Sequence, residues 1–425
     1  MAYLHFDEAK RALSAVAKGR ASDPGVERRL FVVDFMGRIR LVQWDTGASD
    51  DSSVNAALGT SCGQWWTEQI LHAKTLDPVT RKVYEDAWGS ARSEDREERI
   101  RILDRHRSRT GWFMPAEDPP WSAPGDGPAI VVFYSFKGGL GRSTLVASHA
   151  IQRARAGERV CVLDFDLDSP GIGKLLSADT EGRTARWGIV DYLMENPGSD
   201  APLDDYSHRC DRVSGGGQIT VFPAGTLDEA YVDKLARVDL EEGPGAGMAG
   251  IERLIARIHE ELKPSWILID ARTGISELGG RLLSGLAHTH VLLGTNHAQS
   301  WEGLVNILNR LGKERLLVGK AQGDTILVHA MVPMGEAGKI ARIRFSARAE
   351  TEYDARYYLA EDDETAWSMD DKALGDAPHV SVAIEYSPGL ADYGDIADVA
   401  GSITSGPYEE FSTLLANRFI RESEE

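Results

Sequence analysis

Glycines, cations and hydroxyls stand close together between residues 137 and 144, in the stretch KGGLGRST. Gly138, Gly139 and Gly141 have no Cβ, so the backbone can turn tightly there and direct N–H groups at an anion. An apolar run precedes the stretch and a helical pattern follows it, so the positive end of a helix dipole would face the same point. This strand–loop–helix context is the one that a phosphate-binding loop requires.

The side chains of this loop are also typical of nucleotide binding. Ser143 stands where a magnesium-binding hydroxyl is expected, and Thr144 can reach another phosphate. Arg142 has the positive charge that the β- and γ-phosphates need, and its planar guanidinium can make two contacts with one phosphate. Lys137 is a second cation, directly before the paired glycines. The predicted nucleotide-binding residues are Lys137, Gly138, Gly139, Leu140, Gly141, Arg142, Ser143 and Thr144.

Aspartates follow two other apolar runs. VCVLDFDLDSPGIG places Asp164, Asp166 and Asp168 at the end of one run, and SWILIDARTG ends another at Asp270. Taken alone, such aspartates are as typical of helix caps and turns as of a site. In open α/β sheets, however, ligands bind at the carboxyl ends of the strands. The distance of these runs from the loop therefore favours a functional role for their aspartates.

These motifs together resemble the deviant phosphate loop, KGGxGK[ST], of the MinD/ParA class of ATPases, which includes chromosome- and plasmid-partitioning proteins and division-site proteins. Lys137 matches the first lysine of that pattern, and Arg142 departs from the second. The combination of a KGGxGR loop with D-x-D-x-[DE]-x-PG and ID-x-RTG is similar to a bacterial subgroup of the class. The resemblance covers roughly residues 130–420, and none is found for residues 1–114.

The resemblance implies a role for each of the charged residues. Ser143, Asp164 and Asp270 would lie around Mg²⁺, and Asp166 would orient or activate the attacking water. Lys137 would reach the phosphates of the partner protomer across a homodimer that encloses the nucleotides. The catalytic residues are thus Lys137 and Asp166, and the role of Asp168 stays open.

The function that this resemblance implies is a slow, partner-stimulated ATPase that acts as a molecular switch, with ATP and Mg²⁺ as cofactors. Two alternatives stay open. One is an adaptor that binds nucleotide with little hydrolysis, and the other is a ParA-like protein that binds DNA when ATP is bound. Ala330 and Met331 stand where the family often has an adenine-side asparagine, so the preference for ATP over GTP is also open.

After residue 130, apolar runs alternate with helical patterns. Continuous apolar strands joined by helical crossovers predict a mostly parallel sheet with helices on both faces. The expected fold class is therefore α/β, a doubly wound P-loop sheet preceded by a small α+β domain. The predicted strands are 129–136, 159–166, 218–225, 265–271, 290–296, 325–332 and 380–386, and the predicted helices include 142–156, 250–262 and 301–312.

Proline and glycine are dense in MPAEDPPWSAPGDGPA, residues 114–129, which predicts a linker. It would separate an N-terminal α+β domain, 1–113, from a MinD/ParA-like ATPase domain, 130–425. The N-terminal region shows no catalytic spacing, so we expect it to recognise the unidentified protein partner.

Local patterns in the N-terminal region predict its elements. A helix is expected over 6–19, and a hairpin that turns near Gly37 is expected within 28–44. Residues 62–76 and 93–109 are also expected to be helical, the latter because opposite charges recur at i,i+3 and i,i+4 spacing. Trp65 and Trp66 are expected to be core aromatics rather than a binding platform.

The composition limits the other possible partners. A net charge of −19 over 425 residues argues against a general affinity for nucleic acid, although basic residues gather between Arg310 and Arg348. A solvated face is the expectation there, and nucleic-acid binding is open but not favoured. Cys62, Cys161 and Cys210 stand singly, which excludes a cysteine metal cluster. Without a secretory signal, a membrane span or a basic amphipathic tail, the chain is expected to be cytoplasmic and not membrane-bound.

Overall fold

The computed structural model divides the chain into two compact units, Met1–Ser108 and Arg109–Glu425. The residues that it describes are 4–20, 23–47, 49–94, 99–106, 110–113, 118–123, 125–195, 201–238, 246–283, 285–318, 324–359 and 367–419.

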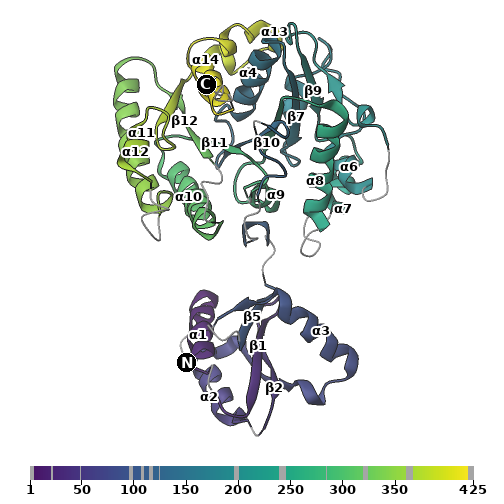
Figure 1. Cartoon of the computed structure of the whole chain (residues 1–425), viewed down its shortest axis with the longest axis vertical. Helices are drawn as coiled ribbons and strands as arrows, with labels where there is room; N and C mark the ends of the chain where they lie inside the picture. The colour runs from purple at the N-terminus through teal and green to yellow at the C-terminus, as the bar shows by residue number, and fades with distance from the viewer. Residues whose placement is uncertain are drawn as a thin grey trace. The chain divides into compact units, whose positions relative to one another are not determined.

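The first unit is a five-stranded sheet in the order β3-β2-β1-β5-β4, with helices on both faces (Figure 1). β1 and β2 form the antiparallel hairpin that was expected, and β5 and β3 join it in parallel on either side. α1 and α2 cover one face and α3 covers the other. The elements are α1 (Phe6–Gly19), β1 (Val26–Val33), β2 (Ile39–Asp45), α2 (Asp51–Cys62), η1 (Gly63–Trp65), β3 (Trp66–His72), η2 (Ala73–Thr75), α3 (Pro78–Ser90), β4 (Arg92–Ser93) and β5 (Ile100–Asp104).

Two helices predicted in this unit are wrong. The segment 62–76 contains strand β3, and 93–109 contains strand β5, apart from the parts that lie outside the described residues. In β5 the alternation of Ile100 and Ile102, which are buried, with Arg101, which is less so, is the period-2 pattern of a strand. Charges spaced by three or four residues fitted a helix equally well, and pairing with β1 decided the outcome.

Trp65 and Trp66 belong to the core of the first unit, as expected. The indole N–H of Trp66 donates to Asn55 Oδ1 at 2.6 Å, and that of Trp65 donates to the Leu4 carbonyl at 2.9 Å. Trp65 also contacts the ring of Phe6 edge-on. Because both polar groups are bonded within the unit, these indoles serve packing rather than ligand binding.

His72, the last residue of β3, joins three elements of the first unit. Its Nδ1 lies 2.5 Å from Asp45 Oδ2 at the end of β2, and its Nε2 lies 2.9 Å from Asp51 Oδ2 in the first turn of α2. Burial lowers the pKa of His72, but Asp45 and Asp51 outweigh it, so the pKa is raised above the ordinary 6.5. Only the protonated imidazole can donate a hydrogen bond to both carboxylates at once.

We expect the first unit to lose stability as the pH rises through the raised pKa of His72. A base whose pKa is higher in the folded state contributes stability that is complete below its unfolded pKa and is lost above its folded pKa. The loss should be on the order of 1 kcal/mol, because the pair is partly exposed. Thermal unfolding and hydrogen exchange of β3 from about pH 6 to about pH 9 would measure it. A His72→Gln variant should lack the dependence, and an equal dependence in that variant would contradict it.

The second unit is built on an eight-stranded sheet in the order β13-β12-β11-β6-β10-β7-β9-β8. Among the strands that the structure describes, only β8, at the edge, pairs antiparallel, so the predicted mostly parallel sheet is confirmed. The strands are β6 (Ala129–Ser135), β7 (Arg159–Phe165), β8 (His208–Arg209), β9 (Gln218–Phe222), β10 (Trp266–Ala271), β11 (Thr289–Gly294), β12 (Asp324–Val332) and β13 (Ser381–Glu385).

Helices cover both faces of this sheet, and they include the three predicted at 142–156, 250–262 and 301–312. The helices are η3 (Thr110–Phe113), α4 (Arg142–Arg155), α5 (Ile172–Leu175), α6 (Ile189–Glu195), η4 (Leu203–Asp205), α7 (Tyr231–Arg237), α8 (Ala246–Arg257), η5 (Ile258–Leu262), α9 (Glu277–Leu282), α10 (Ala298–Val318), α11 (Gly335–Arg356), α12 (Met369–Ala373), η6 (Pro388–Leu390), α13 (Ile396–Val399), η7 (Ser402–Thr404) and α14 (Pro407–Asn417).

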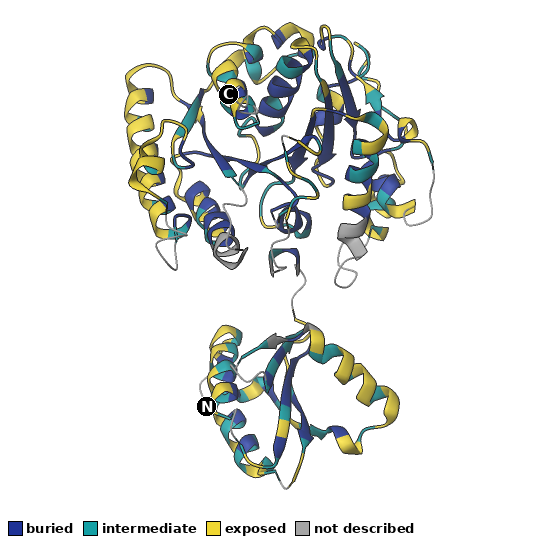
Figure 2. Ribbon diagram, viewed as in Figure 1, coloured by how far each residue is buried: buried dark blue, intermediate teal, exposed yellow. Residues whose placement is uncertain are grey.

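Alternate residues of β6 enter two hydrophobic cores on opposite faces of the sheet. Ile130, Val132 and Tyr134 pack with α8, α9, α10 and α11. Val131 and Phe133 pack with α4 and α14 on the other face. Figure 2 shows the strands buried and the outer faces of helices such as α11 exposed. Burial on both faces explains why the strands read as continuous apolar runs.

The division between the two units falls before the segment predicted as a linker. Gly111 N donates to Glu277 Oε1 at 2.8 Å and the Trp112 indole donates to the Ser276 carbonyl at 2.6 Å, which fixes η3 to α9. Further on, the Trp121 carbonyl accepts a hydrogen bond from His288 Nε2 at 2.7 Å. The described part of 110–129 therefore belongs to the second unit, because its indoles and backbone are bonded there.

Candidate functional site

The predicted site residues meet at the carboxyl edge of the second sheet. β6 leads into the glycine loop and lies between β11 and β10, and β7 lies on the other side of β10. Asp270 is therefore on the strand beside the loop, and its register partner on β7 is Asp164. This strand order, which could not be predicted from the sequence, brings the glycine loop and the two aspartate motifs together.

The backbone of the loop has the conformation that its glycines permit. Gly139 and Gly141 have φ of +75° and +81°, and Gly141 is the N-cap of α4. A Cβ added at Gly138, Gly139 or Gly141 would meet no heavy atom within 4 Å. The loop thus forms an open cradle at a helix N-terminus, which is the geometry that binds phosphate.

Two aromatic residues anchor the start of the loop. A Cβ on Gly303 of α10 would lie 2.0 Å from Phe136 Cγ, so the Phe136 ring rests directly against the helix backbone. The Tyr134 hydroxyl donates to the Gly274 carbonyl at 2.6 Å and ties β6 to the segment after β10. Phe136 therefore occupies the first position of the loop as a packing residue. Sequence reasoning missed Gly303, because nothing in a helical pattern marks which glycine meets an aromatic ring.

Arg142 lies between two of the predicted aspartates. Its Nη2 donates to Asp166 Oδ2 at 2.8 Å, and its Nε forms a close ion pair with Asp270 Oδ1. Ser143 Oγ donates to the other carboxylate oxygen of Asp270 at 2.6 Å. The Arg142 side chain is only 7% exposed, and its Nη1 is buried with no hydrogen-bond partner. Among the described residues, no acceptor is found for one N–H pair of this buried cation.

Asp164 and Asp270 are held in surroundings that oppose their negative charge. Burial and then the charge of Asp270 raise the pKa of Asp164 to about 8, although Gly173 N and Asp166 N donate to it. Burial also raises the pKa of Asp270, against the attraction of Arg142. Because one guanidinium faces three carboxylates, an additional cation would stabilise the ionised cluster.

The donors present fit a magnesium ion that shares its shell with a nucleotide. Within the described ranges, no group of three histidine, cysteine or acidic side chains is arranged to hold a metal by itself. Mg²⁺ is usually bound by one or two protein oxygens together with water and phosphate, and Ser143 and Asp270 offer such oxygens in contact. Asp164 accepts hydrogen bonds from two glycine amides and lies opposite Asp270 on the neighbouring strand.

Lys137 and Asp168 lie apart from this cluster. Lys137 is partly exposed, and in the described part of the chain no ion pair or hydrogen bond of its ammonium group is found. Asp168 forms an exposed ion pair with Arg272, which follows β10. The structure therefore separates Asp168 from Asp164 and Asp166, although the three follow one another at every second residue.

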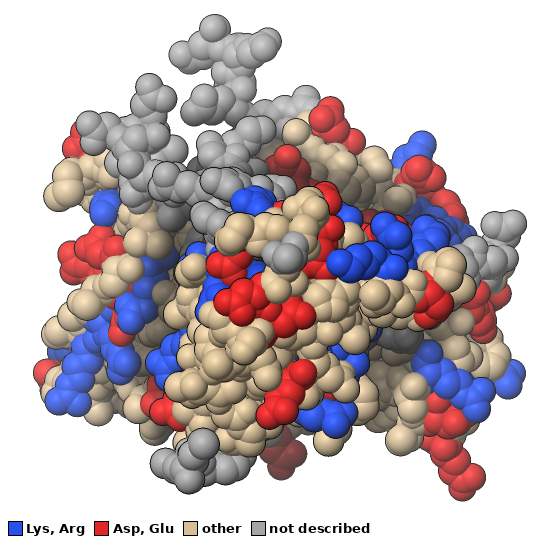
Figure 3. Space-filling model, turned by 90° about the horizontal axis from the view of Figure 1, so that it is seen from below, with Lys and Arg blue, Asp and Glu red and all other residues tan. Residues whose placement is uncertain are grey.

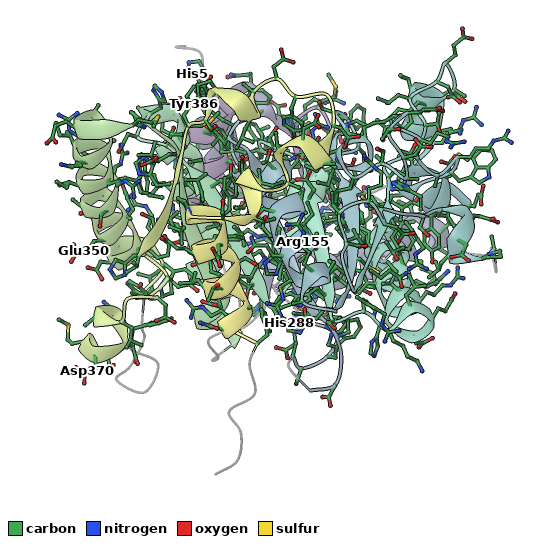
Figure 4. All side chains as sticks on the ribbon, turned by 90° about the horizontal axis from the view of Figure 1, so that it is seen from above. His5, Arg155, His288, Glu350, Asp370 and Tyr386 are labelled. Atoms are coloured by element: carbon green, nitrogen blue, oxygen red, sulfur yellow. The ribbon has the colours of Figure 1, made fainter. Side chains whose placement is uncertain are left out.

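A pocket of about 520 Å³, part of it open to solvent, adjoins the loop on the side of β12 and β13. Gly141 and Thr144 form its wall toward the phosphate cradle, and Ala330 and Met331 line the opposite side. Tyr386, which follows β13, is 44% exposed at the rim and is labelled in Figure 4. The sequence shows that Ala330 and Met331 stand where related proteins often have an asparagine. It did not indicate that Tyr386 lines the same pocket.

The basic segment between Arg310 and Arg348 does not form an open cationic face where it is described. Arg310 is buried and donates to the Gly111 carbonyl at 2.8 Å, so it is not a solvated residue. On α11, Lys339, Arg342 and Arg348 are paired with Glu336, Glu385 and Glu352. The side chains of 313–323 lie outside the described residues. On the face drawn in Figure 3, acidic and basic side chains are interspersed.

No protein-family model matches the chain. A relative found by sequence is the cytosolic Fe-S cluster assembly factor NUBP2 homolog of Trichoplax adhaerens, 36% identical over 64 residues. The match covers 15% of this chain and 24% of the relative, so the chain spans about a quarter of the relative's length. Within the described residues, no helix is both long and apolar enough to cross a membrane.

Solved structures with a similar fold include the MinC:MinD cell division protein complex of Aquifex aeolicus, at a TM-score of 0.42 and 15% identity over 70% of this chain and 98% of that one. A putative plasmid partition protein from Borrelia burgdorferi, bound to AMPPNP, gives 0.42 and 14% over 68% and 97%. The pNOB8 ParA bound to nonspecific DNA gives 0.43 and 13% over 68% and 98%. All three have TM-scores below 0.5 and identities of 15% or less.

Proposed function

For a P-loop chain that resembles the ParA and MinD proteins, we propose the function of an ATP-binding and ATP-hydrolysing switch, whose homodimer encloses the nucleotides and controls a protein partner. The observation that carries the proposal is the buried cluster of Arg142, Ser143, Asp166 and Asp270 beside an open glycine cradle. A cation with an unpartnered buried N–H pair at such a cradle is suited to phosphate.

Hydrolysis in this site would depend on positioning and charge rather than on covalent chemistry. The loop amides and the N-terminus of α4 would bind the phosphates, and Arg142 would turn its guanidinium toward them. Ser143 and Asp270 would hold Mg²⁺, which supplies positive charge to the phosphates when bound. Asp166, released from Arg142, would accept a hydrogen bond from the attacking water and orient it.

The base would occupy the pocket that adjoins Gly141 and Thr144. Its walls are largely apolar, and Tyr386 at the rim can stack on an aromatic ring. Since Ala330 and Met331 have no polar side-chain group, any choice between adenine and guanine would rest on backbone groups of this pocket.

One observation favours the alternative of an adaptor with little hydrolysis. Arg142 is bonded to both Asp166 and Asp270, the residues that would orient water and hold magnesium. If the guanidinium keeps these bonds when nucleotide binds, hydrolysis would be very slow. Nucleic-acid binding is favoured less, because the arginines and the lysine named above on α11 are mostly paired with glutamates.

The first unit would supply a contact for the protein partner. At the turn between β1 and β2, Phe35 is 75% exposed and Met36 is 57% exposed. Two large apolar side chains at the tip of a hairpin are costly in water and are typical of binding surfaces. This assignment to partner recognition stands as a proposal.

The test is to measure ATP binding and phosphate release on the full chain with and without Mg²⁺. We expect binding and slow release, with Asp166→Asn keeping ATP binding but losing turnover by about a hundredfold or more. Asp168→Asn is the matched control, because its exposed ion pair with Arg272 lies outside the cluster, and it should retain turnover. Tight binding without release in the wild type would establish the adaptor instead, and absence of ATP binding would overturn both.

A further inference from the structure

A second pocket, of about 700 Å³ and also partly open to solvent, lies beneath the first turns of α11. We refer to it as the α11 pocket. Asn296 and His297 after β11 form one side, His329 and Met331 near the end of β12 form the floor, and Ile340 and Arg344 of α11 form the rim. It lies on the far side of Met331 from the pocket beside the loop, and Ala330 and Met331 line both.

Large apolar side chains are exposed around the α11 pocket. Met331 is 39% exposed, Met334 71%, Ile340 46% and Ile343 70%. Met331 and Ile340 line the hollow, and Met334 and Ile343 are exposed on the same stretch of thirteen residues. An exposed apolar cluster next to a concave site is typical of a protein-binding surface.

The arginines near the rim of the α11 pocket differ in whether they form an ion pair. Arg342 and Arg348 are each paired with a glutamate, whereas in the described part of the chain no carboxylate is found paired with the exposed Arg344. In the floor, the His329 ring stacks on Phe345 at 4.1 Å, and its Nδ1 is buried without a partner. The pocket thus combines apolar walls with one available cation and one unused ring nitrogen.

Met331 has a strained backbone at this place. Its φ is +56°, which side chains other than glycine rarely adopt, and the pairing of β12 with β13 shifts register between His329 and Val332. Such strain costs on the order of 1–3 kcal/mol and is concentrated at functional sites. The bulge turns the Met331 side chain into the shared wall between the α11 pocket and the pocket beside the phosphate loop.

We propose that the α11 pocket binds a segment of a partner protein that carries a large apolar side chain next to a carboxylate. The apolar side chain would pack against Met331 and Ile340, and the carboxylate would pair with Arg344. Charge complementarity selects an acidic segment, because the other arginines of the helix are already neutralised by this chain's own glutamates.

The same occupant would act on the nucleotide through the shared wall, and this part of the inference rests on the proposed function. A side chain that displaces Met331 changes the wall against which the base would pack. Binding of the segment and binding of ATP would therefore alter one another's affinity by the same factor, as any coupling between two sites requires.

The probe is a displayed library of random twelve-residue peptides, selected on the full chain without nucleotide. We expect enriched peptides in which aspartate or glutamate neighbours a large apolar residue, and at least tenfold weaker binding to Arg344→Glu and to Ile340→Asp. Arg348→Glu is the matched control, because Arg348 is also exposed on α11 but is paired with Glu352, and it should bind normally. Failure to enrich any such peptide, or equal binding to the variants and the wild type, overturns the proposal.

Two further measurements separate other occupants. If Ile343→Asp converts a nucleotide-free dimer of the wild type to a monomer, the surface binds a second copy of this chain and the proposal is wrong. If the wild type binds a DNA duplex and Arg344→Glu abolishes that binding, the surface binds nucleic acid and the proposal is likewise wrong. For the coupling, the selected peptide should change the affinity for ATP in the wild type, and Met331→Gly, which removes the side chain shared by the two pockets, should reduce this change more than it weakens peptide binding. If the wild type binds the peptide but does not bind ATP, the α11 pocket is still a peptide site and only the proposed ATPase function is overturned.

Discussion

The Arg142→Ala variant is expected to lose about 3–5 kcal/mol of stability at pH 8 in the absence of nucleotide, because the arginine is the buried counter-charge of the site. Its guanidinium is 7% exposed and bonds to Asp166 and Asp270, whose side chains are 10% and 1% exposed. Removing only one partner of a buried ion pair leaves the other charge buried and uncompensated, which lowers the stability of the folded protein strongly.

This loss should depend on pH with a definite sign. Burial already raises the pKa of Asp270, and without Arg142, which lowers it, the pKa would rise further. A carboxyl whose pKa is higher in the folded state contributes stability that is present below its unfolded pKa and is lost as the pH rises through the folded value. The variant should therefore be much closer to the wild type at about pH 5 than at about pH 8.

Thermal and denaturant unfolding at the two pH values would measure the effect. The double variant Arg142→Ala/Asp270→Asn should recover most of the lost stability at the higher pH, because the uncompensated charge is gone. Arg153→Ala, which breaks a pair with Glu158 whose side chains are 24% and 29% exposed, is the control and should cost about 1 kcal/mol or less. If Arg142→Ala unfolds like the wild type at both pH values, the arginine is not the counter-charge of the cluster.

The fold of the second unit could be predicted largely from its sequence, for a physical reason. Strands buried on both faces must be apolar throughout, so β6, β7 and β10 appear as uninterrupted runs. The loop glycines and the aspartates follow these runs at once, so their place at the carboxyl edge of a parallel sheet was predictable. Strand order was not, because it depends on which strands pair rather than on any single segment.

Features that depend on contacts between distant segments were not predictable. The Phe136 ring against Gly303 and the two bonds of Arg142 each join residues more than twenty positions apart. In the first unit, the predicted helices at 62–76 and 93–109 contain β3 and β5, and the charge spacing of 93–109 fits a helix as well as a strand. Pairing with β2 and β1 decides between the two, and a local pattern contains no information about pairing.

The second large effect is expected when Lys137 is replaced, because this lysine should be needed for ATP hydrolysis but not for ATP binding. In the proposed function, Arg142, Ser143 and the loop amides would provide the phosphate contacts within one chain, whereas no partner of the Lys137 ammonium group is found in the described part of its own chain. Lys137→Ala should bind ATP with nearly unchanged affinity and lose turnover by about a hundredfold or more. It should also fail to dimerise when ATP is added.

Mixing two inactive variants tests whether this lysine acts on the partner's nucleotide. Lys137→Ala retains its own Asp166, and Asp166→Asn retains its own Lys137. If the lysine reaches across the dimer, each mixed dimer contains one complete site. An equal mixture should then recover about a quarter of wild-type turnover if the chains pair at random, and up to about half if Lys137→Ala pairs only with the other variant. If Lys137 acts within its own chain, no site in the mixture is complete and turnover stays at the level of the single variants.

The control for this mixture replaces Asp166→Asn with Ser143→Ala/Asp166→Asn, which still supplies Lys137 to its partner. It should rescue Lys137→Ala equally well, because the complete site lies in the other protomer. Rescue that fails in both mixtures, with dimers confirmed by size, would assign Lys137 to its own phosphate loop. A Lys137→Ala chain that hydrolyses and dimerises like the wild type would remove the lysine from the mechanism altogether.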